Sequence, residues 1–355
     1  MFSFRTTPIE EQLDRSLHEG KVACFCTQNC WNPYSSRYVY DIFKERGNLA
    51  KIFLPRSSEL TPQTNHIEFD AADLEGLSAV VVEIQDVGSR YFNYTRDVMQ
   101  LMSMCARMEE SPSIYIVDHI NPAGRVVEGT IPAIESDIWT PKVAHRHGLT
   151  LGELCQLYYS EIGAKFPLHI ISAHCSHVGK EMLPWTIAPA SDIPGMFTCD
   201  LYSGGGLWNN TSMTPGIGTA RPYEYFGAPW LRVEDVRFIP TPAGAMMRPC
   251  TFTPAAGRYK DEQCFGYQIM LMPGAQYHSL LHTLLLMRYF ANQYPEKFEM
   301  YDSLFVKVAD PVIEEYLRGR LSFDVVQEHV KTEEQKWVRK AKRFALYDDP
   351  PYRMK

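Results

Sequence analysis

The sequence of 355 residues lacks several patterns that mark common classes of protein. It has no run of about 18 apolar residues, so we expect no membrane-spanning helix. Its first residues, 1–6, lack the apolar run of a secretory signal, which predicts a cytoplasmic location for the chain as given. Lysine and arginine number 35 against 42 acidic residues, a net charge of −7. This balance argues against a protein whose whole surface binds nucleic acid.

Motifs for nucleotides and for activated nucleophiles are also missing. The glycine-rich residues 203–206 match neither the Walker pattern nor GxGxxG, and no GxSxG turn occurs. A nucleotide-dependent enzyme or a serine hydrolase of the usual kind is therefore disfavoured.

Cysteine and histidine give no framework of disulfides or metal ligands. The nine cysteines are scattered, odd in number and without a CxxC pair. Cys24 and Cys26 fit better as small apolar residues on one face of a buried strand. Among the histidine pairs, only His278 and His282 have helical spacing, and they lack the glutamate of a metalloprotease helix. We expect no metal site.

What is present fits a soluble α/β protein of about two domains, with 45% apolar and 22% charged residues. Short apolar runs alternate with helical patterns in the first half. Strands are expected at residues 21–26, 50–54, 77–84 and 113–118, and helices at 38–46 and 97–109. This alternation predicts a Rossmann-like, doubly wound, mostly parallel sheet.

The pattern changes after a strand at 168–172. A loop-rich tract over 183–254 precedes a strand near 267–272 and helices near 278–293, 311–318 and 323–343. We predict a Rossmann-like domain over residues 1–165 and a smaller, loop-rich α+β domain over 166–355, with a cleft between them.

Polar residues cluster where two predicted strands end, the usual place for a ligand in such sheets. The carboxylates near strand ends and loops are Glu83, Asp86, Asp118, Glu128, Glu153 and Asp192. A pair of carboxylates facing a cleft can catalyse glycoside hydrolysis. Two structural alternatives stay open: Glu153 can cap a helix that begins after Thr150, and Asp86 can form an ion pair with Arg90. Arg90 lies among aromatic residues, which suits a sugar that carries a carboxylate.

Ordered motifs along nearly the whole chain resemble the exo-acting β-N-acetylmuramidases, a family long described only as a bacterial domain of unknown function. Residues 83–92 (EIQDVGSRYF) resemble its acidic-x-QDVG-x-R-aromatic signature, and 117–124 (VDHINPAG) its DRPNPxG segment, with His119 in place of arginine. Residues 147–153 (HGLTLGE) resemble its HGMTxGE segment. Residues 183–185, 218–222 and 227–230 follow in the family's order.

This resemblance implies a Rossmann-like domain with a smaller C-terminal domain, an active cleft between them, and no metal or organic cofactor. It implies a cell-wall function in bacteria, peptidoglycan recycling, through release of terminal N-acetylmuramic acid. The expected partner is thus a small amino sugar or muropeptide. We predict that catalysis is carried by Asp86, Asp118 and Glu153, and that substrate is bound by Gln85, Arg90, Asn121, His147 and Arg221.

The chain departs from the family at catalytic positions. The family's PEHG segment reads Pro55-Arg56-Ser57-Ser58, so its glutamate is missing, and Glu59 lies three residues away. A second family glutamate is replaced at Asn209, and an arginine at Ile217. The primary hypothesis is a glycosidase of this family. The alternative is a relative that binds the sugar without hydrolysing it.

Overall fold

The computed structural model describes residues 8–33, 35–54, 70–134, 141–173, 187–232, 234, 239–274 and 276–347. Some residues of the sequence argument lie outside these ranges, namely Arg56, Ser57, Glu59, and residues 183–185.

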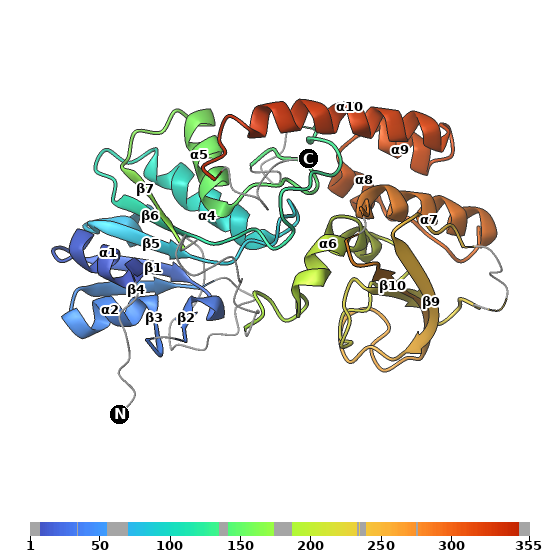
Figure 1. Ribbon diagram of the computed structural model, residues 1–355, viewed down its shortest axis with the longest axis horizontal. Helices are drawn as coiled ribbons and strands as arrows, with labels where there is room; N and C mark the ends of the chain where they lie inside the picture. Colours follow the sequence, from blue (N-terminus) through green and yellow to red (C-terminus); the bar gives the residue numbers. More distant parts are fainter. Residues whose placement is uncertain are drawn as a thin grey trace.

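Five parallel strands form the centre of the N-terminal part, the chain up to residue 173 (Figure 1). They are β1 (Val22–Cys26), β4 (Leu49–Phe53), β5 (Ala79–Glu83), β6 (Ser113–Asp118) and β7 (Leu168–Ser172), in the order β4-β1-β5-β6-β7. β1 is buried along its whole length, as its apolar run predicts. The predicted doubly wound α/β fold is confirmed.

Helices cover both faces of this sheet. α1 (Pro8–Ser16) and α2 (Val39–Arg46) pack on the face that carries Cys24 and Cys26. α3 (Ala71–Leu74), α4 (Asn93–Cys105) and α5 (Leu151–Glu161) pack on the opposite face. A 3-10 turn (Gln28–Cys30) and a two-stranded ribbon, β2 (Trp31–Asn32) with β3 (Arg37–Tyr38), follow β1.

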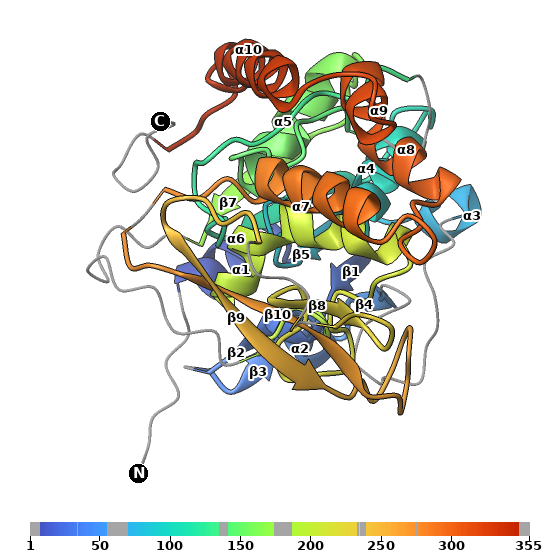
Figure 2. The same ribbon diagram turned by 90° about the vertical axis from the view of Figure 1, so that its right-hand side faces the viewer.

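The C-terminal part, from residue 187, is built on a second sheet. Its strands β8 (Tyr225–Ala228), β9 (Ala245–Phe252) and β10 (Cys264–Leu271) are antiparallel in the order β8-β10-β9. Figure 2 shows α6 (Met196–Gly205) and α7 (Ser279–Gln293) above these strands. A Cβ at Gly204 would lie 2.2 Å from Ser279 O, so a residue without a side chain is needed where the two helices meet. Three shorter helices follow α6 or α7: a 3-10 helix (Gly206–Asn210), α8 (Asp302–Val308) and α9 (Pro311–Leu317).

The last helix, α10 (Phe323–Ala341), runs across the top of both parts in Figure 1. Trp337 on it is fully buried and donates from Nε1 to His147 O over 2.8 Å. One hydrophobic core continues from Phe25 on the parallel sheet to Leu280 on α7 and Trp337. The two parts are therefore packed together rather than joined only by a linker.

Two differences from the sequence expectation concern the middle of the chain. β7 pairs with β6 although it lies beyond residue 165, so the first sheet ends a few residues later than the predicted boundary. The tract over 183–254 contains α6, β8 and β9, and is more regular than expected.

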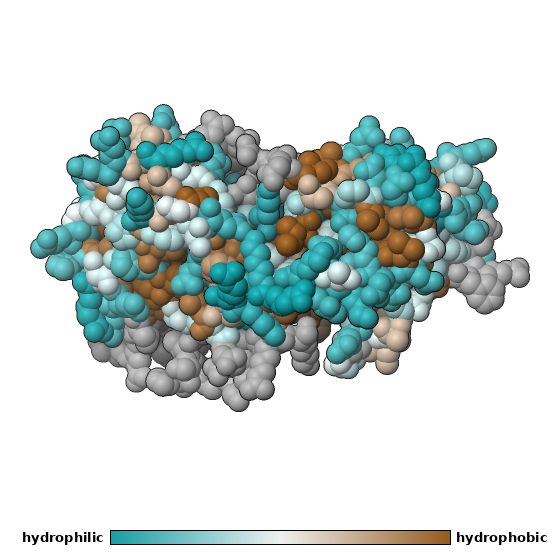
Figure 3. Space-filling model, turned by 90° about the horizontal axis from the view of Figure 1, so that it is seen from above, coloured by the Kyte–Doolittle hydropathy of each residue, from teal (hydrophilic) through white to brown (hydrophobic). Residues whose placement is uncertain are grey.

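No helix of the described residues is long and apolar enough to cross a membrane. On the face seen from above in Figure 3, the described residues are mostly hydrophilic, with small apolar patches between them.

Candidate active site

The order of the parallel strands reverses between β1 and β5, and ligands of such sheets bind beside the carboxyl ends of the strands at that point. The chain segments that leave β1, β5 and β6 lie at this edge, towards the C-terminal part. Gln28, after β1, donates from Nε2 to Ala188 O over 2.9 Å and to Pro189 O over 3.0 Å. This edge of the sheet is therefore joined directly to the chain that leads into α6.

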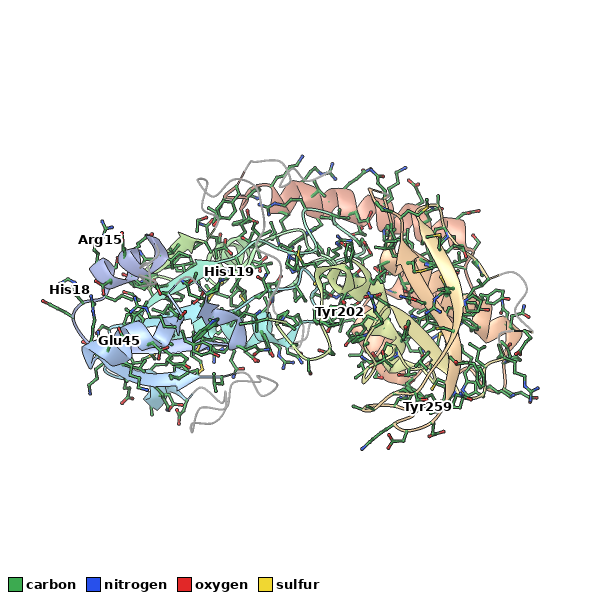
Figure 4. All side chains as sticks on the ribbon, turned by 60° about the horizontal axis from the view of Figure 1, so that its bottom comes forward. Arg15, His18, Glu45, His119, Tyr202 and Tyr259 are labelled. Atoms are coloured by element: carbon green, nitrogen blue, oxygen red, sulfur yellow. The ribbon has the colours of Figure 1, made fainter. Side chains whose placement is uncertain are left out.

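Glu83 and His119 form a pair at the ends of β5 and β6. His119 Nε2 lies 3.1 Å from Glu83 Oε1, and the two side chains are 27% and 13% exposed. Burial lowers the pKa of His119, but the hydrogen bond and the charge of Glu83 outweigh it, so the net shift is upward. Figure 4 shows His119 in the N-terminal part and Tyr202 on α6 across from it. The pair can exchange a proton with a ligand at this edge.

Asp86 is buried and held by internal donors. Its Oδ2 accepts from Gly88 N over 2.7 Å, and its Oδ1 from Thr95 Oγ1 over 2.6 Å. His147 Nδ1 accepts from Leu149 N, which leaves Nε2 to face Asp86 Oδ2 at 3.3 Å. Burial raises the pKa of Asp86, but the charge and hydrogen bond of His147 with the two donors outweigh it and lower the pKa. Asp86 thus fixes the turn after β5.

Asp118 ends β6 and is fully buried. It accepts from Thr150 Oγ1 over 2.7 Å, from Gly152 N over 2.8 Å and from Tyr347 OH over 2.9 Å. Burial raises its pKa to about 6 although these three donors act in the opposite direction. A Cβ at Gly152 would lie 2.6 Å from Asp118 Oδ2, so the glycine permits this close contact.

Glu153 is fully buried in the first turn of α5 and forms the predicted capping box with Thr150. Its carboxylate also binds the guanidinium of Arg125 through both oxygens, with Nη2 to Oε1 at 2.7 Å. Leu346 N donates to Oε1 over 2.8 Å. The capping role considered for Glu153 is confirmed, and the residue also anchors the C-terminal segment.

Arg90 extends from the turn after β5 towards the C-terminal part. Its Nη1 donates to Thr130 O over 2.7 Å, and its Nη2 to Val308 O over 2.6 Å and to Lys307 O over 3.0 Å. His145 Nε2 lies 3.0 Å from Nη2. The guanidinium therefore joins the 84–92 turn to the end of α8.

The remaining predicted binding residues are divided between the edge of the sheet and the surface. Gln85 donates from Nε2 to Ile120 O over 2.9 Å, and Asn121 from Nδ2 to Leu149 O over 2.9 Å. Arg221 is 54% exposed in its side chain and pairs with Glu224 at 3.2 Å. The structure brings together all the predicted site residues except Arg221 at the carboxyl edge of the sheet, and their contact with a substrate stays a prediction.

A charge network that the sequence did not predict lies between the two parts, with Arg146 and Glu128 buried at its centre. Arg146 binds Glu128 at 3.0 Å and Asp200 on α6 at 2.6 Å. His278, the N-cap of α7, lies 3.5 Å from Glu128 and 2.8 Å from Glu334 on α10. Glu128 was a candidate carboxylate, but no local motif in the sequence links it to residues so far along the chain.

A second missed cluster consists of Tyr91, Tyr202, Tyr223, Asp192 and Lys307. The rings of Tyr91 and Tyr202 lie 6.5 Å apart, and those of Tyr202 and Tyr223 4.6 Å apart, both edge to face. Tyr223 OH donates to Asp192 Oδ2 over 2.7 Å. The sequence signalled Tyr91 and Asp192 separately, but it gave no sign of Lys307.

Metal-binding geometry is not found in the part of the chain that the structure describes. There, no three His, Cys, Asp or Glu residues are grouped in a way that could hold an ion. His278 and His282 bind different partners. His282 contacts Tyr277 OH and Pro240 O, whereas His278 binds Glu128 and Glu334.

Solved structures with the same fold support this architecture. Two DUF1343 family proteins from Bacteroides fragilis NCTC 9343 superpose with TM-scores of 0.80 and 0.76, at 19% and 21% identity. Each similarity covers 96% of this chain, and 97% and 98% of the other chains.

Sequence comparison identifies the family. The family model described as exo-beta-N-acetylmuramidase NamZ, N-terminal, matches residues 63–192, and that of its C-terminal domain matches 200–347. The peptidoglycan beta-N-acetylmuramidase NamZ of Bacillus subtilis (strain 168) is 26% identical over 239 residues. That similarity covers 64% of this chain and 56% of the relative, so the chain spans little more than half of the relative's length. With both domain models matched in order, the chain belongs to the exo-β-N-acetylmuramidase NamZ family.

Proposed function

We propose that this protein is a glycosidase that releases terminal N-acetylmuramic acid from peptidoglycan fragments, in the recycling of the cell wall. Membership of the NamZ family supports the reaction class and the sugar. The observation that most supports a reaction at this site is the pair of Glu83 and His119, which lies where the strand order reverses. Glu83 is a carboxylate that is partly exposed, so a ligand can reach it.

Glu83 has the chemistry that cleavage of a glycosidic bond requires. A carboxyl group at the edge of a cleft can protonate the leaving oxygen or stabilise the positive charge that develops on the sugar. His119 holds one oxygen of Glu83 and, when protonated, supplies the proton that the carboxylate passes on.

Asp86, Asp118 and Glu153 remain in the proposed site, with tasks that follow from their contacts. Each is 3% exposed or less and is bound by at least three internal donors. We propose that they hold the turns after β5 and β6 and the start of α5, and thereby keep Glu83 and His119 in place. Through their own hydrogen bonds, Gln85, Asn121 and His147 help to hold the same turns.

Binding without hydrolysis is the second candidate. The same burial favours it, because the three predicted catalytic carboxylates are committed to internal partners. The replacement of a family glutamate at Asn209 points in the same direction. In that case the protein binds the amino sugar or muropeptide as a sensor or an accessory subunit.

A proton NMR time course with the disaccharide N-acetylmuramic acid–N-acetylglucosamine separates the two. Hydrolysis predicts that anomeric signals of free N-acetylmuramic acid grow with time in proportion to protein concentration. Ligand signals that broaden with added protein but never change into product signals would contradict hydrolysis and support the binding protein. If the signals show neither product formation nor broadening, both candidates are wrong.

A further inference from the structure

Lys307 places a positive charge at the junction of the two parts of the molecule. It lies in the last turn of α8 and is only partly buried. Its Nζ donates to Gly206 O over 2.9 Å and lies 4.8 Å from the centre of the Tyr91 ring. An ammonium group has three N–H donors, and Gly206 O takes one of them. The group can therefore still donate to a ligand.

Arg90 fixes the backbone that carries this ammonium group. Its hydrogen bonds to Lys307 O and Val308 O attach the end of α8 to the turn after β5, the turn that also presents Tyr91. Burial, and then the charge of Arg90, lower the pKa of Lys307 to about 8. The fold thus holds the ammonium group of Lys307 close to the guanidinium of Arg90. An anion bound on the solvent side of Lys307 would reduce the repulsion between these two cations.

An aromatic wall leads away from Lys307. Gly206 packs closely against it: a Cβ there would lie 3.4 Å from Tyr202 and 3.6 Å from Tyr91. Tyr223 extends the wall, and its OH donates to Asp192 Oδ2. The charge of Asp192 opposes the lowering of the Lys307 pKa but does not outweigh burial and Arg90. The three rings are 3–9% exposed, so they form the buried side of this junction and keep the surroundings of the ammonium group apolar. A cation held against such an aromatic surface suits the acid group of a sugar.

We propose that Lys307 binds the carboxylate of the acidic sugar, and that Arg90 positions it for this task. The assignment rests on the proposed function, since it names the group that recognises the lactyl acid of N-acetylmuramic acid. Arg90 was predicted from the sequence to bind this acid itself, whereas its carbonyl partners suit the positioning role. Lys307 would make the protein prefer an acidic over a neutral amino sugar.

The experiment compares two ligands that cannot be hydrolysed by a glycosidase. They are free N-acetylmuramic acid and the same sugar with its lactyl acid converted to a methylamide, titrated by NMR or calorimetry. The wild type is expected to bind the acid about 10- to 100-fold more tightly than the amide, the usual range for one charge-assisted hydrogen bond. Lys307→Met should bind both forms with the same low affinity, and Lys307→Arg should keep a preference for the acid.

A matched control is Lys336→Met, which removes a lysine that is 56% exposed on α10 and should leave the preference unchanged. Thermal unfolding of each variant checks that the fold is intact. A preference for the acid that survives in Lys307→Met would overturn the assignment while leaving the proposed function standing. So would a wild type that binds acid and amide equally. A wild type that binds neither form would overturn the assignment, whereas the proposed function fails only if the disaccharide N-acetylmuramic acid–N-acetylglucosamine is also neither cleaved nor bound.

Discussion

Two equally buried carboxylates show how the partners of a residue decide the direction of its pKa shift. Asp118 accepts three hydrogen bonds, and yet its pKa is raised to about 6 because no water reaches it. Glu128 has the opposite net shift: burial raises its pKa, but the charges of His278 and Arg146 outweigh burial and lower it. The difference follows from the partners, since Asp118 is bound by neutral donors and Glu128 by cations.

The raised pKa of Asp118 predicts how the free energy of unfolding changes with pH. Its pKa is raised in the folded protein above the 3.8 of an ordinary aspartate, so between about pH 4 and 6 the folded chain holds a proton that the unfolded chain releases. This contribution to the free energy of unfolding is present at low pH and is lost as the pH rises through about 6. Its size is about 2–3 kcal/mol.

The test compares the wild type with Asp118→Asn by urea unfolding at several pH values between about 4 and 7. The stability of the wild type relative to the variant should increase as the pH falls. A difference in unfolding free energy that stays constant over this range would contradict a raised pKa for Asp118.

At the scale of the elements, α5 is fixed by its first turn. Thr150 accepts from Glu153 N through its hydroxyl oxygen and donates to Asp118, while Glu153 accepts from Thr150 N. The helix begins where it does because both halves of the capping box are present. One side chain thereby links the end of β6 to the start of α5.

Thr150→Ala should therefore lower the free energy of unfolding by about 1–3 kcal/mol, through a lost cap and a lost hydrogen bond to a buried carboxylate. Ser322→Ala is the matched control, because Ser322 occupies the N-cap of α10 without a side-chain cap bond. That change should cost less than about 0.5 kcal/mol. Equal losses in the two variants would show that the capping box does not stabilise α5 as the contacts indicate.

The sequence predicts elements well where one physical signal dominates. Ser113–Asp118 and Leu168–Ser172 were expected with the bounds that the structure has, because each contains a short apolar run with β-branched isoleucines. Most of β6 is buried, whereas β7 lies at the edge of the sheet and only Ile171 on it is buried. β9 was missed, since its side chains are mostly exposed and it contains Pro249, so that neither alternation nor an apolar run is visible. α6 was missed because it ends in consecutive glycines that read as a loop.

The site was predictable only in part, for a related reason. The residues after β5 and β6 follow directly from strand ends, which the sequence reveals. Lys307 and Asp200 arrive from helices of the C-terminal part, and only the packing of α6 and α8 against the turns after β5 and β6 brings them there. Contacts of that kind depend on the whole fold and leave no local pattern.

At the scale of the whole molecule, the two parts share one hydrophobic core and are held by α10 on top. Glu334 on α10 accepts from Gly129 N over 2.7 Å and binds His278 of α7, and Lys340 pairs with Glu161 of α5 at 2.5 Å. The parallel sheet, the second sheet and the last helix therefore depend on one another for stability.

This arrangement predicts a single cooperative unfolding transition in urea, in contrast to the separate steps of loosely joined domains. Far-UV circular dichroism and tryptophan fluorescence should give the same midpoint, since buried Trp208 reports on the C-terminal part and Trp337 on the junction. Two resolved midpoints would contradict the shared core.

The proposed role of Glu83 in cleavage of a muramic acid glycoside is tested most directly by the rate at which Glu83→Gln releases N-acetylmuramic acid. The substitution keeps the shape of the side chain but removes its charge and its acidity. We expect a loss of about 10³-fold in rate with binding retained. Glu45→Gln, at a glutamate that is 65% exposed, should match the wild type. A Glu83→Gln protein that releases the sugar at the wild-type rate would contradict this role.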